Sequence, residues 1–65
     1  MVKLIVDDYE QITTLEWMLM ANDIPHEISL KESDYGIKPP YLIVDGVPLD
    51  FNRSIRWIRE HGVNG

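Results

Sequence analysis

The chain has 11 Asp and Glu and two His residues, whose side chains could act as acids or bases or hold a metal ion, but their spacing follows no catalytic or metal-binding motif. Its 65 residues include no cysteine, which excludes a disulfide, a thiolate nucleophile and a sulfur ligand for zinc. The two histidines, His26 and His61, are not spaced as metal ligands usually are, so we interpret them as surface or core-edge residues. No glycine-rich phosphate loop or Ser-His-Asp arrangement is evident. The sequence therefore predicts a protein that is not an enzyme and that uses no metal and no other cofactor.

The carboxylates near the N-terminus fit the start of a helix better than a catalytic pair. Asp8 is followed three residues later by Gln11, which resembles a capping box, and Glu10 adds negative charge where a helix start favours it. We therefore expect a capped helix to begin at Asp8.

Turn residues divide the rest of the sequence into short apolar segments that are typical of strands. Asp45-Gly46 is a two-residue hairpin signal between two apolar runs. Pro48 cannot donate a hydrogen bond to a neighbouring strand, so we expect its strand at a sheet edge. The expected order is βαβββα or βαββα. The predicted strands are Val2–Val6, His26–Leu30, Tyr41–Val44 and Val47–Leu49. The first predicted helix runs from Asp8 to near Ala21. The second runs from Arg53 to His61, with Asn52 as its N-cap and Gly62 at its end.

Composition limits the classes of partner. The chain is 45% apolar and 26% charged, as expected for one globular domain spanning residues 1–65. A formal charge of −5 has the wrong sign for a protein that must neutralise phosphates, so nucleic acid is disfavoured as a partner. The apolar runs are too short to span a membrane, and we see no signal peptide. We expect a cytoplasmic protein.

The segment from Pro39 to Gly46, with the sequence PPYLIVDG, resembles the third strand of glutaredoxins, which follows a cis-proline and ends in an Asp-Gly hairpin. With the order of strands and helices, it makes the chain similar to the thioredoxin superfamily, and its last segment is similar to the N-terminal domain of glutathione transferases. The resemblance implies a thioredoxin-like (glutaredoxin-like) α/β fold with a mixed sheet of about four strands and two helices. The family's second helix has no counterpart between Leu30 and Pro40, and Pro40 falls on the cis-proline position.

The same resemblance implies a ligand pocket but not the family's chemistry. The Cys-x-x-Cys position falls on Tyr9-Glu10-Gln11-Ile12, so both cysteines are absent, and Asp50-Phe51 replaces the Gly-Gly that helps to hold glutathione. A non-redox small-molecule binder with a pocket at Tyr9, Gln11, Pro40 and Tyr41 is therefore the alternative function. Glutathione itself is disfavoured because carboxylates lie where its anion would bind. A degenerate transferase using Tyr9 ranks third.

Two apolar surfaces favour a protein-binding function instead. Trp17 and Met20 form a second stripe on the first predicted helix, opposite the face of Ile12, Leu15 and Leu19, and this stripe would either pack against the last helix or contact a partner or a second copy. The two predicted helices can cover only one face of the sheet. The other face would be an exposed patch, unless the aperiodic loop from Lys31 to Lys38, with Tyr35 and Ile37, folds across it.

The last predicted helix carries a basic stripe. Arg53, Arg56 and Arg59 lie on one side, and Trp57 is one turn from Arg53 and close enough to stack with it. This stripe is either a solvated face or a contact for an acidic partner. Taken together, the residues favour a non-catalytic module that binds another protein, or a second copy of itself, through the open sheet face or the Trp17-Met20 stripe.

Overall fold

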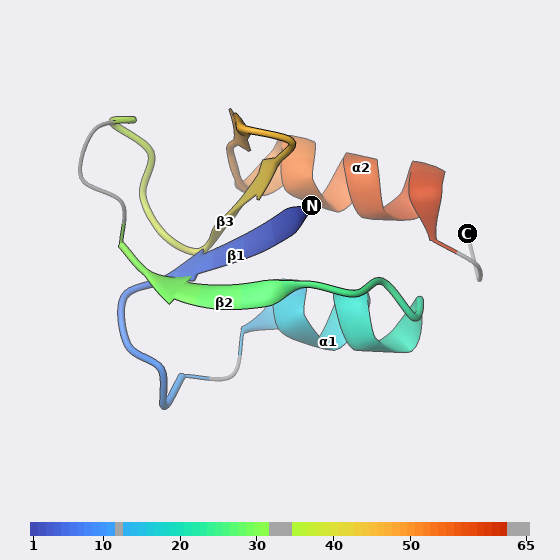
Figure 1. Ribbon diagram of the computed structural model, residues 1–65, viewed down its shortest axis with the longest axis horizontal. Coiled ribbons are helices and arrows are strands. Elements are labelled where there is room, and N and C mark those ends of the chain that lie inside the picture. Colours follow the sequence, from blue (N-terminus) through green and yellow to red (C-terminus); the bar gives the residue numbers. More distant parts are fainter. Residues whose placement is uncertain (12, 32–34, 63–65) are drawn as a thin grey trace.

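The computed structural model describes residues 1–11, 13–31 and 35–62, which form a four-stranded mixed sheet and two helices (Figure 1). The strands lie in the order β2-β1-β3-β4, with β1 parallel to β2 and antiparallel to β3. The predicted α/β class and βαβββα order are confirmed. The elements are β1 (Val2–Val6), α1 (Thr14–Ala21), β2 (Glu27–Leu30), β3 (Tyr41–Val44), β4 (Val47–Leu49) and α2 (Phe51–His61).

β1 lies inside the sheet, and its side chains are buried on both faces. Leu4 pairs with Ile28 of β2 and with Leu42 of β3, so these three side chains share one face. Ile5 pairs with Tyr41 and points to the other face. Leu4 and Ile5 are fully buried, as a nearly continuous apolar strand predicts.

The hairpin between β3 and β4 forms where the sequence predicts it. Asp45 has a φ of 50° and Gly46 a φ of 84°, and positive φ at both residues is what a type I′ hairpin turn requires. Pro48 pairs with Ile43, and β4 is the last strand of the sheet, so the predicted edge position is confirmed.

α1 begins later than the sequence predicts. Its N-cap is Thr13, whose Oγ1 accepts a hydrogen bond from the N–H of Glu16 at 3.1 Å. The assignment of Asp8 as the cap is wrong, because its Oδ1 accepts a hydrogen bond from the N–H of Glu10 at 3.0 Å in a turn that precedes the helix. Thr13 and Glu16 have the capping-box spacing as well, so the sequence offered two helix starts and the chain uses the second.

The end and the inner side of α1 agree with the sequence. The helix ends at Ala21, and Asp23, with a φ of 55°, turns the chain towards β2. Leu15 and Leu19 are buried against the sheet, which confirms two positions of the predicted inner face. The third, Ile12, lies outside the described residues.

α2 begins before the predicted Arg53. Its N-cap is Asp50, whose Oδ1 accepts a hydrogen bond from the N–H of Arg53 at 2.8 Å, so the assignment of Asn52 as the cap is wrong. A carboxylate at this position both satisfies a free N–H and faces the positive end of the helix, which explains why Asp50 is used.

Gly62 ends α2, as predicted, and it lies next to the C-terminal end of α1. Its N–H donates a hydrogen bond to the carbonyl of Ile58 at 2.8 Å, and its φ of −82° is one that any residue can adopt. A Cβ at this position would overlap the side chain of Asn22, the C-cap of α1. The lack of a side chain, rather than backbone freedom, is therefore what this position requires.

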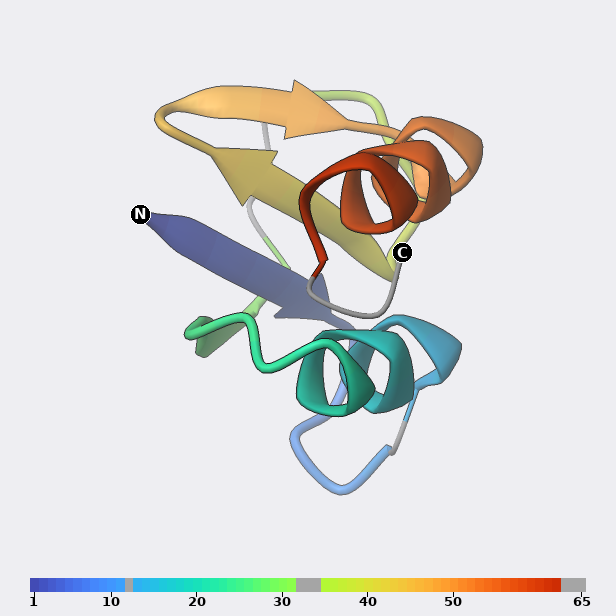
Figure 2. The same cartoon turned by 90° about the vertical axis from the view of Figure 1, so that its right-hand side faces the viewer.

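Both helices cover the same face of the sheet, as Figure 2 shows. α2 packs against α1 and against β3 and β4. The core on this face consists of Val2, Leu4, Val6, Leu15, Leu19, Leu42 and Ile58.

The connection between β2 and β3 covers the opposite face. Ile5 and Tyr41 are fully buried there, Ile43 is nearly so, and Ile37 of the connection packs against them. Of the two alternatives for this face, the exposed apolar patch is therefore wrong, and the loop that carries Ile37 folds across the face instead. A short loop carrying one aliphatic side chain is enough to cover a sheet face this narrow, although residues 32–34 of the loop lie outside the described part of the chain.

Candidate functional site

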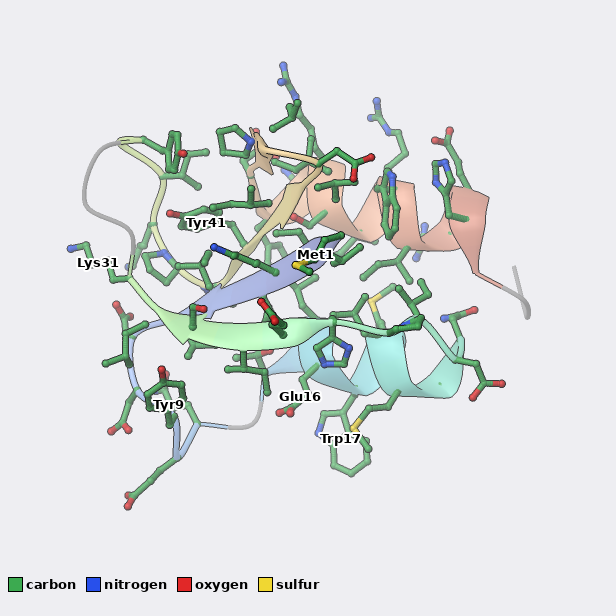
Figure 3. All side chains as sticks on the ribbon, in the orientation of Figure 1. Met1, Tyr9, Glu16, Trp17, Lys31 and Tyr41 are labelled. Carbon is green, nitrogen blue, oxygen red and sulfur yellow. The ribbon has the colours of Figure 1, made fainter. Side chains whose placement is uncertain are left out.

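Trp17 extends from α1 away from the sheet (Figure 3), and Met20 lies about one turn further along the same side of the helix. The Trp17 side chain is 61% exposed and that of Met20 is 59% exposed. The expectation that α2 covers this stripe is therefore wrong. α2 packs on the inner side of α1 instead, where Ile58 joins Leu15 and Leu19 in the core.

A shallow, open hollow lies beside Met20, between the end of α1 and the start of β2. It forms because the N–H of Ile24 donates a hydrogen bond to the carbonyl of Leu19 at 2.9 Å, which folds the chain back along the helix. Ile24 and Pro25 add apolar surface to its wall. Its lining residues are Leu19, Met20, Asp23, Ile24, Pro25 and His26. We refer to Trp17, Met20, Ile24 and Pro25 together as the Trp17 surface.

The apolar surface continues around the start of β2. A second hollow, of about 290 Å³, is lined by Met1 and Val2 together with Pro25, His26 and Glu27, so the two hollows share Pro25 and His26. The His26 ring is fixed by its Nδ1, which lies 2.9 Å from the carbonyl oxygen of Ile24. His26 is thus a half-buried residue between two hollows, which agrees with its interpretation as a core-edge histidine.

The segment that carries the Trp17 surface is acidic. Residues 4–30 contain no lysine or arginine, and their acidic residues are Asp7, Asp8, Glu10, Glu16, Asp23 and Glu27. Glu16 and Asp23 lie on either side of Met20 in the sequence, four residues before it and three after it, and Asp23 also lines the hollow beside Met20. The ion pairs within the described residues are Met1 with Asp45 and Arg53 with Asp50, so neither Glu16 nor Asp23 is neutralised by a cation there.

The four residues expected to form a ligand pocket are not gathered at a helix start. Tyr9, which is 62% exposed, and Gln11 lie in the segment before α1. Pro40 is half-buried, and the Pro39-Pro40 peptide bond is cis. Tyr41 is fully buried on the sheet face opposite the helices, and Figure 3 shows it well apart from Tyr9. Tyr41 therefore has no surface with which to contact a ligand or a partner.

The basic stripe on α2 is exposed, but its expected aromatic contact is different. The Trp57 ring stacks on His61, with ring centroids 4.5 Å apart and planes at 17°, and not on Arg53. The Nε of Arg53 lies 4.0 Å from Oδ2 of Asp50, an exposed pair of the kind that adds little stability. Arg56 and Arg59 are also exposed, so the outer side of α2 is a solvated, charged face.

Ser54 is an internal contact that sequence reasoning missed. It is the fully buried polar residue of α2, and its hydroxyl donates to the carbonyl of Leu49 at 2.9 Å and accepts from the N–H of Leu42 at 3.0 Å. The hydroxyl thereby links β3 and β4 at the end of the hairpin farthest from its turn. The signal was present in the sequence, because Ser54 lies four residues before Ile58 and so on the core-facing side of the helix.

A third hollow, of about 350 Å³, lies on the sheet face that the β2–β3 connection covers. At its rim the N-terminal ammonium of Met1 lies 2.6 Å from Oδ1 of Asp45. This hydrogen bond and the positive charge lower the pKa of the Asp45 carboxyl. The other lining residues are Lys3, Tyr35, Ile43 and Gly46.

Residues 1–11, 13–31 and 35–62 contain no group of three or more histidine, aspartate or glutamate side chains placed to hold a metal ion. In the same residues, neither helix has the length and apolar character needed to cross a membrane. The sequence matches no family model, and comparisons with curated proteins and with solved structures find no similar protein. The function must therefore be inferred from the residues of this chain.

Proposed function

We propose that this chain is a non-catalytic, glutaredoxin-like module that binds another protein through the Trp17 surface. One observation carries the proposal: Trp17 and Met20 are both mostly exposed, although they are adjacent on the outer side of a helix whose inner side is well buried. Large apolar side chains that gather at one exposed place usually mark an association surface.

The identity of the two side chains supports a protein partner. Tryptophan is among the residues that most often contribute strongly to binding at protein interfaces, and methionine adapts its shape to different partners. Moving a fully exposed methionine side chain out of water contributes about 1.5–3 kcal/mol, from which the entropic cost of association is subtracted. Trp17 can serve as an anchor on the partner, and the shallow hollow lined by Met20 can accept an apolar side chain of the partner.

The position of the surface also supports binding. α1 is fixed on its inner side by Leu15 and Leu19, which are fully buried, and at its end by the contact of Asn22 with Gly62. A rigid helix that already displays its binding residues loses little conformational entropy when a partner docks. The Trp17 surface is therefore organised before binding.

The experiment compares Trp17→Asp with Tyr9→Asp as baits in affinity capture, followed by measurement of the affinity of each captured protein after its purification. Tyr9 is a matched control because it is an equally exposed aromatic residue in a different place. We expect Trp17→Asp to weaken binding of the partner by at least about tenfold, as loss of a dominant interface residue does, and Tyr9→Asp to change it little.

Both substitutions replace exposed side chains, so we expect the free energy of unfolding of each variant to stay within about 0.5 kcal/mol of the wild type. Urea unfolding followed by circular dichroism checks this. If Trp17→Asp binds the purified partner as tightly as the wild type does, the proposed binding surface is wrong. If only Tyr9→Asp loses binding, the site lies in the segment before α1.

A further inference from the structure

The charges around the Trp17 surface identify the kind of partner that it fits, an inference that rests on the proposed function. Glu16 precedes Trp17 on α1, and Asp23 begins the turn that forms the hollow. α1 has no basic residue in its last turn, and within the described residues no cation pairs with Glu16 or Asp23. The apolar surface thus lies between two carboxylates for which the described residues supply no cation.

An uncompensated charge beside an apolar contact selects among partners. A neutral partner would partly remove these carboxylates from water without offering them a cation, and an acidic partner would be repelled. A partner that carries lysine or arginine around an apolar anchor would restore the lost interactions and would also be attracted at long range.

A second copy of this chain fits less well. Each copy carries a formal charge of −5, so two copies repel each other as they approach. The basic stripe of α2 could approach the Trp17 surface of another copy, but α2 belongs to the same acidic molecule. Lipid headgroups and nucleic acids that carry negative charge are repelled for the same reason.

We infer that the Trp17 surface binds a cationic protein segment, in which an apolar side chain enters the hollow beside Met20 and flanking lysines or arginines face Glu16 and Asp23. The apolar contact supplies most of the affinity. The carboxylates supply the preference for a basic sequence and make binding sensitive to salt.

The test uses two synthetic peptides with the same leucine positions, one with lysine and the other with glutamate at the remaining positions. The two tryptophans of the protein give an internal control in NMR, because Trp17 lies on the exposed side of α1 whereas Trp57 packs against the core. We expect the lysine peptide to shift the indole N–H signal of Trp17 and the amide signals of residues 20–24 and His26, and to leave the indole signal of Trp57 unchanged. We expect no such shifts with the glutamate peptide.

Neutralising variants test the role of the charges. We expect the double substitution Glu16→Gln with Asp23→Asn to weaken the lysine peptide roughly fivefold and to reduce the salt dependence of its affinity. Asparagine is suitable at position 23 because it tolerates the positive φ there. Glu60→Gln removes one exposed carboxylate from α2 and is the matched control, which should leave the affinity unchanged.

Four outcomes would overturn the inference. If both peptides bind equally well at Trp17, the surface does not select for positive charge, although the proposed function stands. If the lysine peptide shifts only residues 7–10, the charges attract it without the apolar contact, and if it shifts no signal, the Trp17 surface does not bind a cationic segment. If the Trp17 signal depends on protein concentration without peptide and sedimentation shows a dimer, a second copy covers the surface.

Discussion

The two helices cover the same face of the sheet and contribute to the same core, but their outer sides differ. α2 presents Arg53, Arg56, Arg59 and Glu60 to solvent, whereas the outer side of α1 presents Trp17 and Met20. Beyond its first residue, Phe51, which is 38% exposed, α2 has its apolar residues on its inner side and charged residues on its outer side, so it has little apolar surface left for a partner. α1 is apolar on both sides, so its outer side has surface that folding alone does not bury.

The comparison also separates residues that hold the fold from residues that remain available for binding. α2 is joined to the sheet by Ser54 as well as by Ile58, and both are fully buried. On α1, Leu19 is fully buried, whereas Trp17, two residues before it, is mostly exposed. Substitutions on the two sides of α1 should therefore affect different properties.

The largest expected effect is on the inner side of α1. We expect Leu19→Ala to lower the free energy of unfolding by about 2–5 kcal/mol, because it leaves a cavity in the core. Met20→Ala, its neighbour on the outer side, should change it by less than about 0.5 kcal/mol. Urea unfolding measures both. Equal destabilisation by the two substitutions would show that the outer side of α1 is part of the core, and the distinction between the sides would fail.

A smaller effect is expected at the polar link between α2 and the sheet. Ser54→Ala leaves the buried N–H of Leu42 without its hydroxyl acceptor, which should lower the free energy of unfolding by about 1–3 kcal/mol. Asn52→Ala is the matched control, because it makes the same gain in helix propensity at an exposed position of α2. Hydrogen exchange should show a faster-exchanging Leu42 amide in Ser54→Ala alone. A Ser54→Ala variant as stable as Asn52→Ala would mean that the hydroxyl contributes nothing.

The smallest effect concerns Asp45, which lies in the hairpin turn between β3 and β4 and belongs to neither helix. The Met1 ammonium lowers the pKa of its carboxyl, so the folded state favours the carboxylate. This contribution to stability is present above the unfolded pKa of about 3.9 and is lost as the pH falls through the lower pKa of the folded state. We expect a carboxyl-carbon NMR titration of Asp45 to have its midpoint below about 3.9, and the difference to shrink at high salt. A midpoint at or above this value would contradict the ion pair.

Most of the fold could be predicted from the sequence because its signals are local. Val2–Val6 and Tyr41–Val44 are short apolar runs, and Asp45-Gly46 specifies its turn through backbone conformation. The helix starts were wrong because the sequence offers two possible caps at each one. Either Asp8 or Thr13 could cap α1, and either Asp50 or Asn52 could cap α2. The choice depends on where each helix must meet the sheet, which is a tertiary constraint.

The candidate site was predictable only in part. The helical spacing of Trp17 and Met20 placed them opposite the core-facing leucines, but whether α2 covered them depended on the angle at which the helices pack. The burial of Tyr41 depended on the path of the β2–β3 connection, whose aperiodic sequence does not specify its direction. Local patterns thus identified the residues, and packing decided which of them remained exposed.

The most direct test of binding through the outer side of α1 is site-specific photo-crosslinking in the cells that make the protein. A photoreactive phenylalanine analogue would replace Met20 in one variant and Glu60, an exposed residue of α2, in the other. We expect the Met20 position to form a covalent adduct with another protein, which disappears when Trp17→Asp is added, and the Glu60 position to form none. Adducts from the Glu60 position alone, or a Met20 adduct that persists with Trp17→Asp, would contradict binding through the Trp17 surface.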